Sequence, residues 1–257
     1  GQHGTIHTAE GTVDGVIGQT AIHLREADGD DVPDVSEQHV DIGAEDAEEA
    51  GELVDRGDPI TFDQQISELQ NGLLSARGMD NRIGIWAAAE GLRRAAEIGT
   101  DATVYAVSTV QEEVGVQGAK MVGFDLDPDA AIAVDVTHAT DQPDSPGKQS
   151  SGVALGDGPV VARGSANHPV LVDAVRETAD ETDIDVQLQA TGIRTGTDAD
   201  AFYTTRGGIP SLNVGLPNRY MHTPVEVIDP VDLDELADLL AGFAVRADSF
   251  GPFRVDL

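Results

Sequence analysis

Apolar and polar positions divide the chain into two parts with different periodicity. From residue 1 to about residue 63, short alternating runs separated by Gly and Asp predict a small β domain with one acidic helix. From residue 64 to residue 257, apolar runs of strand length alternate with segments of helical period, which predicts an α/β sheet with helices on both faces. The predicted strands are 4–8, 12–17, 38–42, 59–62, 73–77, 103–110, 130–136, 159–162, 185–189 and 209–215, and the predicted helices are 44–53, 85–98, 168–182, 198–203 and 230–250.

The net charge of the chain indicates which partners and which cellular environment are compatible with it. Its net charge is −32, from 47 acidic and 15 basic residues, and this balance argues against nucleic-acid binding, which needs Lys and Arg against phosphate. No run of 18 apolar residues occurs, so no membrane span is predicted. The acids are spread between the periodic segments and Lys is scarce, as in cytoplasmic proteins of halophiles, where molar salt screens charges over about 3 Å. We therefore expect a halophilic, cytoplasmic protein.

Five chemically capable side chains each lie within a few residues after a predicted strand. They are Asp80, Glu112, Glu113, Asp135 and His222. Ligands of open α/β sheets bind beyond the carboxyl ends of the strands, so these side chains should converge on one rim. The chain has no cysteine, which excludes thiolate ligands and a Cys nucleophile.

Three of these four carboxylates, together with the imidazole, would form an oxygen-rich site that suits Zn, Co or Mn. Two metals about 3.5–4 Å apart would need a bridging carboxylate, and a spare carboxylate beside them could act as general base. Each residue alone also has an ordinary interpretation: Asp80 as a helix cap, Asp135 as a turn acid and His222 as a packed loop histidine.

Four local sequences, taken in order, resemble those of the tetrahedral (TET) aminopeptidases, a family of dimetal peptidases. They lie at residues 79–84, 110–115, 133–137 and 218–226, and residues 196–199 and 15–24 resemble the same family. The resemblance implies a mixed-sheet zinc-peptidase domain at residues 64–257. It also implies that residues 1–63 are part of a β-barrel-like dimerisation domain inserted into the peptidase domain.

The resemblance also implies the chemistry. The family removes N-terminal residues from short peptides with two divalent metal ions, Zn or Co, with Mn as a further option, and it assembles as a homo-oligomer, normally a dodecamer. Carried over to this sequence, Asp80 bridges the metals, Glu113 and His222 bind one metal and Asp135 binds the other. Glu112 is then the general base that acts on a metal-bound water.

One family ligand has no counterpart in this sequence. The family carries a further His in a His-x-Asp motif on a strand that precedes the inserted domain, whereas Gly1 already corresponds to a point inside that domain. We therefore expect the chain to be an N-terminally truncated fragment with an incomplete second metal site. His138 and Asp141, just beyond Asp135, are candidates for replacing the lost ligand.

Other classes of function fit the sequence less well. Gly164-Ser165-Ala166 lacks the nucleophile elbow of a serine hydrolase, and Gly147-Lys148 lacks the spacing of a P-loop. Glu112 and Glu113 leave a glycoside hydrolase open as an alternative, although that chemistry does not need Asp80 or His222. A truncated assembly subunit without activity is the third alternative.

Overall fold

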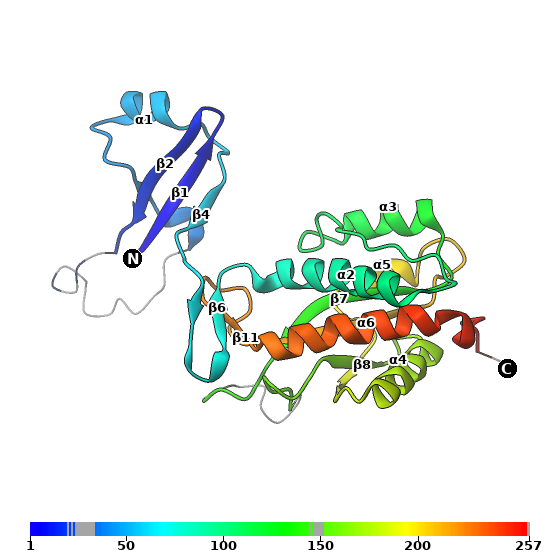
Figure 1. Cartoon of the computed structure of the whole chain (residues 1–257). Helices are drawn as coiled ribbons and strands as arrows, with labels where there is room; N and C mark the ends of the chain where they lie inside the picture. Colours follow the sequence, from blue (N-terminus) through cyan, green and yellow to red (C-terminus); the bar gives the residue numbers. More distant parts are fainter. Residues whose placement is uncertain (20, 22, 24–33, 144, 146–151, 256–257) are drawn as a thin grey trace. The chain divides into compact units, whose positions relative to one another are not determined.

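The computed structural model describes residues 1–19, 21, 23, 34–143, 145 and 152–255. The chain forms two compact units, residues 1–65 and residues 66–257 (Figure 1). No helix among the described residues is both long enough and apolar enough to cross a membrane.

The first unit is built on a four-stranded antiparallel sheet. Its strands are β1 (Gln2–Thr8), β2 (Gly11–Ile17), β3 (Val40–Asp41) and β4 (Ile60–Phe62), in the order β3-β2-β1-β4, with the short 3-10 helix η2 (Val35–Glu37) and helix α1 (Ala47–Leu53). Helix α1 begins where the Asp46 carboxylate accepts hydrogen bonds from the amides of Glu48 and Glu49. The sequence also predicts an acidic loop at residues 28–34, and most of it lies outside the described residues. A barrel-like closure of this unit stays a prediction.

The second unit contains a mixed four-stranded sheet, which confirms the predicted fold class. Its strands are β7 (Ala131–His138), β8 (Val160–Gly164), β9 (Gln187–Thr191) and β10 (Ser211–Asn218), in the order β7-β10-β8-β9. Strand β10 is parallel to β7 and antiparallel to β8, and β8 is parallel to β9.

Helices cover both faces of this sheet, as the sequence predicted. Helices α2 (Met79–Ile98), α4 (Pro169–Thr182) and α6 (Pro230–Phe250) lie on one face, and alternate residues of β10, Leu212, Val214 and Leu216, fill the core beneath them (Figure 1). Helices α3 (Gln117–Leu126) and α5 (Ala199–Phe202) lie on the other face, where Ala119 and Phe202 pack near Ala131.

A small second sheet brings together two segments of the candidate site, the start of α2 and the loop after β10. It consists of β5 (Ser67–Glu68), β6 (Leu74–Ala76) and β11 (Glu226–Ile228), in the order β11-β6-β5, with the short 3-10 helix η3 (Gln70–Gly72) between β5 and β6. Strand β6 leads into α2, and β11 follows the loop after β10. The antiparallel pairing of β6 with β11 therefore brings the start of α2 beside that loop.

Several predicted boundaries were wrong. Helix α2 begins at Met79 rather than at Ile85, and β10 continues to Asn218. The strand predicted at residues 103–110 is also wrong, because the segment forms no strand ladder in the described part of the chain. Its β-branched composition is suited to a strand, but β propensity depends on packing against cross-strand neighbours.

A wide cleft lies between this segment and the sheet. It has a volume of about 1780 Å³, and residues 102–107 line it together with residues 129–135 of the β7 region. Among the described residues β7 is paired along one edge only, and Tyr105 is 60% exposed. Asp80, Glu112, Glu113 and Asp135 also line this cleft, so the candidate site opens into it.

Candidate metal centre

Asp80 is held at the start of α2 by its neighbour Asn81. The Asn81 amide donates a hydrogen bond to the carbonyl of Val134 on β7 (2.8 Å) and its oxygen accepts one from the Gly84 amide (3.0 Å). A Cβ on residue 84 would lie 2.2 Å from that Asn81 oxygen, so the contact requires glycine. Asp80 itself departs from helical geometry (φ −75°, ψ 108°), and its carboxylate lies beside β7 rather than along the helix.

A tight turn after residue 110 presents Glu112 and Glu113. The amides of Gly115 and Val116 donate to the Glu112 carbonyl at 3.0 and 2.9 Å, and the Gly118 amide donates to the Val110 carbonyl at 2.9 Å. Gly115 has φ 116°, a conformation that glycine adopts without strain. The two adjacent carboxylates thus occupy a turn closed at both ends, which limits where they can lie.

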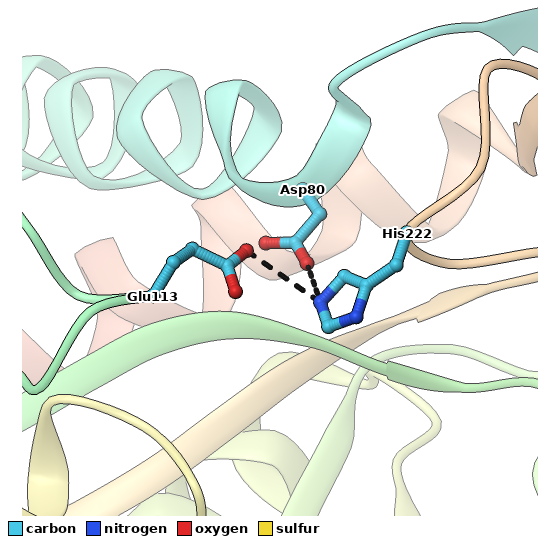
Figure 2. A group of neighbouring side chains, drawn as sticks. All are labelled: Asp80, Glu113 and His222. Carbon is cyan, nitrogen blue, oxygen red and sulfur yellow. Dashed lines mark ion pairs between the residues drawn. The ribbon is translucent and has the colours of Figure 1, made fainter. Parts of the chain in front are cut away.

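Asp80, Glu113 and His222 converge in space, each from a different element (Figure 2). The Nε2 atom of His222 lies 2.9 Å from an oxygen of Asp80 and 3.5 Å from an oxygen of Glu113. One ligand atom from each residue lies within 4.8 Å of the others. Two carboxylates and an imidazole at this spacing fit a divalent cation such as Zn²⁺.

Asp135 and Glu112 lie in the same electrostatic environment as Asp80. Burial raises the pKa of Asp135 to about 8, and the charges of Asp80 and Glu112 add to this effect. Burial also raises the pKa of Glu112 to about 7, with further contributions from Asp198 and Glu113. The pKa of Asp80 rises to about 6, first through burial and then through the charge of Glu113. A divalent cation would relieve this crowding of negative charge.

Asp198 also belongs to this cluster, although no role was predicted for it. One of its oxygens accepts a hydrogen bond from the Thr109 hydroxyl at 2.5 Å, and the other is buried without a hydrogen-bond partner in the described part of the chain. Asp198 lines the cleft, and burial raises its pKa. Asp198 lies inside Gly196-Thr-Asp-Ala199, a stretch that resembles the TET aminopeptidases, and this resemblance is the signal that could have identified it.

The two candidates for a replacement ligand, Asp141 and His138, have different surroundings. Asp141 forms a two-pronged ion pair with Arg219, at 2.7 and 2.6 Å, and also accepts a hydrogen bond from the Leu155 amide. Its oxygens are therefore already engaged, which disfavours a role as metal ligand. His138 is exposed at the end of β7 and stays an untested candidate.

An α/β sheet with carboxylates and an imidazole gathered at one rim is typical of a metal-dependent hydrolase. The sequence profile described as M42 glutamyl aminopeptidase matches residues 1–239. The chain belongs to the M42 glutamyl aminopeptidase family. This match gives no support to the glycoside hydrolase alternative.

Individual relatives agree with the family. The chain is 34% identical to a lysyl aminopeptidase of Pyrococcus furiosus over 90% of this chain and 66% of the relative. A TET aminopeptidase structure from a marine-sediment thaumarchaeon has a TM-score of 0.90 at 30% identity, covering 99% of this chain and 73% of that one. The TET1 peptidase of Pyrococcus horikoshii, described as assembling into a tetrahedron or a large octahedral shell, has a TM-score of 0.83 at 33% identity, covering 95% and 72%. The chain thus spans about two thirds to three quarters of the length of these proteins.

Proposed function

We propose that this chain is the metal-binding and catalytic part of a co-catalytic dimetal aminopeptidase that removes N-terminal residues from short peptides. The observation that carries the proposal is the convergence of Asp80, Glu113 and His222 beside the buried Asp135 and the half-buried Glu112, both of which have raised pKa values. Membership of an aminopeptidase family supports the reaction class.

The residues divide into ligands and a base. Asp80, Glu113 and His222 would hold one divalent ion, and Asp80 together with Asp135 would contribute to a second. When bound, such ions act as Lewis acids that polarise the peptide carbonyl. Glu112 does not belong to the group of three converging ligands, and its pKa of about 7 suits a base that accepts a proton from the attacking water near neutral pH.

The second metal position has fewer ligands than the first. Among the described residues, Asp80 and Asp135 are the groups that we assign to it, whereas a catalytic Zn usually has three protein ligands. The cleft along β7 leads to this position and has room for an extended segment. We infer that a further ligand, of the His-x-Asp type seen in the resemblance, completes the second position from outside the 257 residues.

We further propose that the protein is cytoplasmic, halophilic and a homo-oligomer of the TET type. The oligomer rests on relatives described as a dodecamer and as a tetrahedral or octahedral shell. The halophilic character rests on the net charge of −32.

The activity is tested with an aminoacyl-anilide and with the N-acetylated derivative of the same compound. We expect the protein, extended by an N-terminal strand that ends in His-x-Asp and loaded with Zn²⁺ or Co²⁺, to cleave only the substrate with a free amino group. Equal cleavage of the two substrates would contradict an aminopeptidase. Absence of cleavage, with both metals bound, would favour the inactive assembly subunit.

A further inference from the structure

Glu226 is a buried carboxylate that the proposed reaction does not use. It is 1% exposed and begins β11. One of its oxygens accepts a hydrogen bond from the Met79 backbone amide at 2.7 Å, and the other accepts one from the Asn218 side-chain amide at 3.0 Å. A single side chain therefore bonds to both segments from which two of the converging ligands emerge.

The first of these segments is the start of α2. Met79 directly precedes Asp80, and its amide is one of the helix N-terminal donors that lack a partner within the helix. Glu226 satisfies this donor and so fixes the backbone next to Asp80. A carboxylate at a helix N-terminus is also electrostatically favourable.

The second segment is the loop that carries His222. The backbones of Arg219 and Val227 close the neck of this loop with two hydrogen bonds, at 2.9 and 3.0 Å, and the side-chain bond from Asn218 to Glu226 adds a further link beside this pair. Tyr220 and His222 adopt φ values of 60° and 61°, in the left-handed region that residues other than glycine adopt infrequently. The loop therefore depends on its closed neck to keep His222 in place.

The charge of Glu226 has no counterpart in the described part of the chain. Its two hydrogen-bond donors are neutral, and it takes part in none of the ion pairs formed by the described residues. A buried charge is costly unless an opposite charge lies nearby. The pKa of Asp80 is raised first by burial and then by the charge of Glu113, and the charge of Glu226 adds to this effect.

We propose that Glu226 is a positioning residue for the metal ion held by Asp80, Glu113 and His222. It sets the separation of Asp80 and His222 through its two hydrogen bonds, and its buried negative charge favours a cation at this place. This inference rests on the metal centre of the proposed function. Outer residues that orient metal ligands typically change metal affinity 10- to 100-fold when they are replaced.

Asp232 provides a matched control. It is 0% exposed, and its carboxylate accepts hydrogen bonds from the amides of Gly156 and Gly158, at 2.8 and 2.9 Å, remote in sequence from the metal ligands. Glu226→Gln and Asp232→Asn therefore remove similar buried charges, and they differ in whether the ligand segments are affected.

The test is Co²⁺ binding to the whole chain, followed by calorimetry and by the visible absorption spectrum of the bound ion. We expect Glu226→Gln to weaken Co²⁺ binding about 10- to 100-fold and to alter the spectrum. Asp232→Asn should lower the melting temperature of the metal-free chain but leave the Co²⁺ affinity within about twofold. If Glu226→Gln does not fold, Glu226→Asp, which keeps the charge and shortens the reach, should fold and show an affinity below that of the wild type.

Three results would overturn the inference. Unchanged Co²⁺ affinity in both Glu226 variants would remove the positioning role and leave the metal centre intact. Equal weakening by Asp232→Asn would show that the effect is general destabilisation. Failure of the wild-type chain to bind Co²⁺ at all would instead contradict the proposed metal centre, and the inference would fall with it.

Discussion

The Nε2 atom of His222 lies 2.9 Å from a carboxylate oxygen of Asp80, although the two residues come from opposite ends of the second unit's sequence. Asp80 reaches this point from the first turn of α2, and His222 reaches it from the loop between β10 and β11. The pairing of β6 with β11 makes the meeting possible because it lays the two loops side by side. The candidate centre is therefore a product of the tertiary fold and not of one local motif.

Glu112 and Glu113 are neighbours with different proposed roles, so their variants should behave differently. Glu112→Gln should retain the metal and lower turnover about 10²- to 10⁴-fold, the usual range for general acid–base catalysis. Glu113→Gln should lose metal affinity, because it removes one of three converging ligands. Metal content by elemental analysis and turnover of an aminoacyl-anilide check both variants. Loss of metal in Glu112→Gln would show that Glu112 is a metal ligand and not the general base.

The metal-free protein should become less stable as the pH rises from about 4 to about 8. The folded state raises the pKa values of Asp80, Glu112 and Asp135 to about 6, 7 and 8, above their ordinary values. The folded state then binds more protons than the unfolded state, so the stabilising contribution is complete below the ordinary pKa values and is lost as the pH passes the folded ones. Melting temperatures of the metal-free protein across this range measure the effect.

Asp135→Asn is the control for this pH dependence. Its amide does not titrate, so the loss of stability near pH 8 should be smaller than in the wild type. Each proton contributes at most about 1.4 kcal/mol per pH unit to the free energy of unfolding. A melting temperature of the metal-free wild type that rises between pH 6 and pH 8 would contradict the assigned shifts.

Stability should depend strongly on salt. The net charge of −32 is screened over about 10 Å in 0.1 M salt and over about 3 Å in 1 M salt, so self-repulsion falls as salt is added. We expect the melting temperature to rise between about 0.1 M and several molar KCl. The same melting temperature throughout this range would contradict the halophilic interpretation.

Substrates should be short peptides with a free amino terminus. Folded proteins and internal bonds of casein should stay uncut, because the proposed reaction starts at the amino terminus. Chromatography of peptide products distinguishes stepwise removal of single residues from internal cleavage. Release of sugar from carboxymethylcellulose without peptidase activity would revive the glycoside hydrolase alternative.

The sequence predicted an α/β sheet with helices on both faces because these elements have clear hydrophobic periods, whereas the mixed strand directions were implied by the family resemblance. Helix α6 and strand β7 are examples, since each has an apolar face that packs in the main core. The segment 103–110 shows the limit of this approach. Its composition predicts a strand, but a strand also needs a neighbour, and neighbours are set by the tertiary fold.

The residues of the candidate site could be proposed from the sequence. The residues that contact and position them could not. Asp80, Glu113 and His222 follow predicted strands, which is a local signal, although the strand predicted before Glu113 does not form in the described part of the chain. Glu226 and Asp198 act through contacts with residues far away in the chain, so hydrophobic period and spacing carry no information about them. These contacts became visible only in the folded structure.

The second metal position should bind metal only weakly in the 257-residue chain. It has Asp80 and Asp135 among the described residues, whereas the first position has Asp80, Glu113 and His222. We expect the 257-residue chain to be nearly inactive, and an added N-terminal strand ending in His-x-Asp to restore the second metal and the activity together. Two tightly bound metals on the chain as given would mean that another residue, with His138 the first candidate, completes the site.

Metal stoichiometry of the wild type and of His222→Ala tests the central claim most directly, namely that Asp80, Glu113 and His222 form a metal centre. After loading with Zn²⁺ and extensive dialysis, elemental analysis should find about one metal per wild-type chain and almost none per His222→Ala chain, because a three-ligand site that loses its imidazole binds weakly. His168→Ala, at the N-cap of α4, should retain the metal and serves as the control. Zinc retained equally by His222→Ala and the wild type, or by neither protein, would contradict the account.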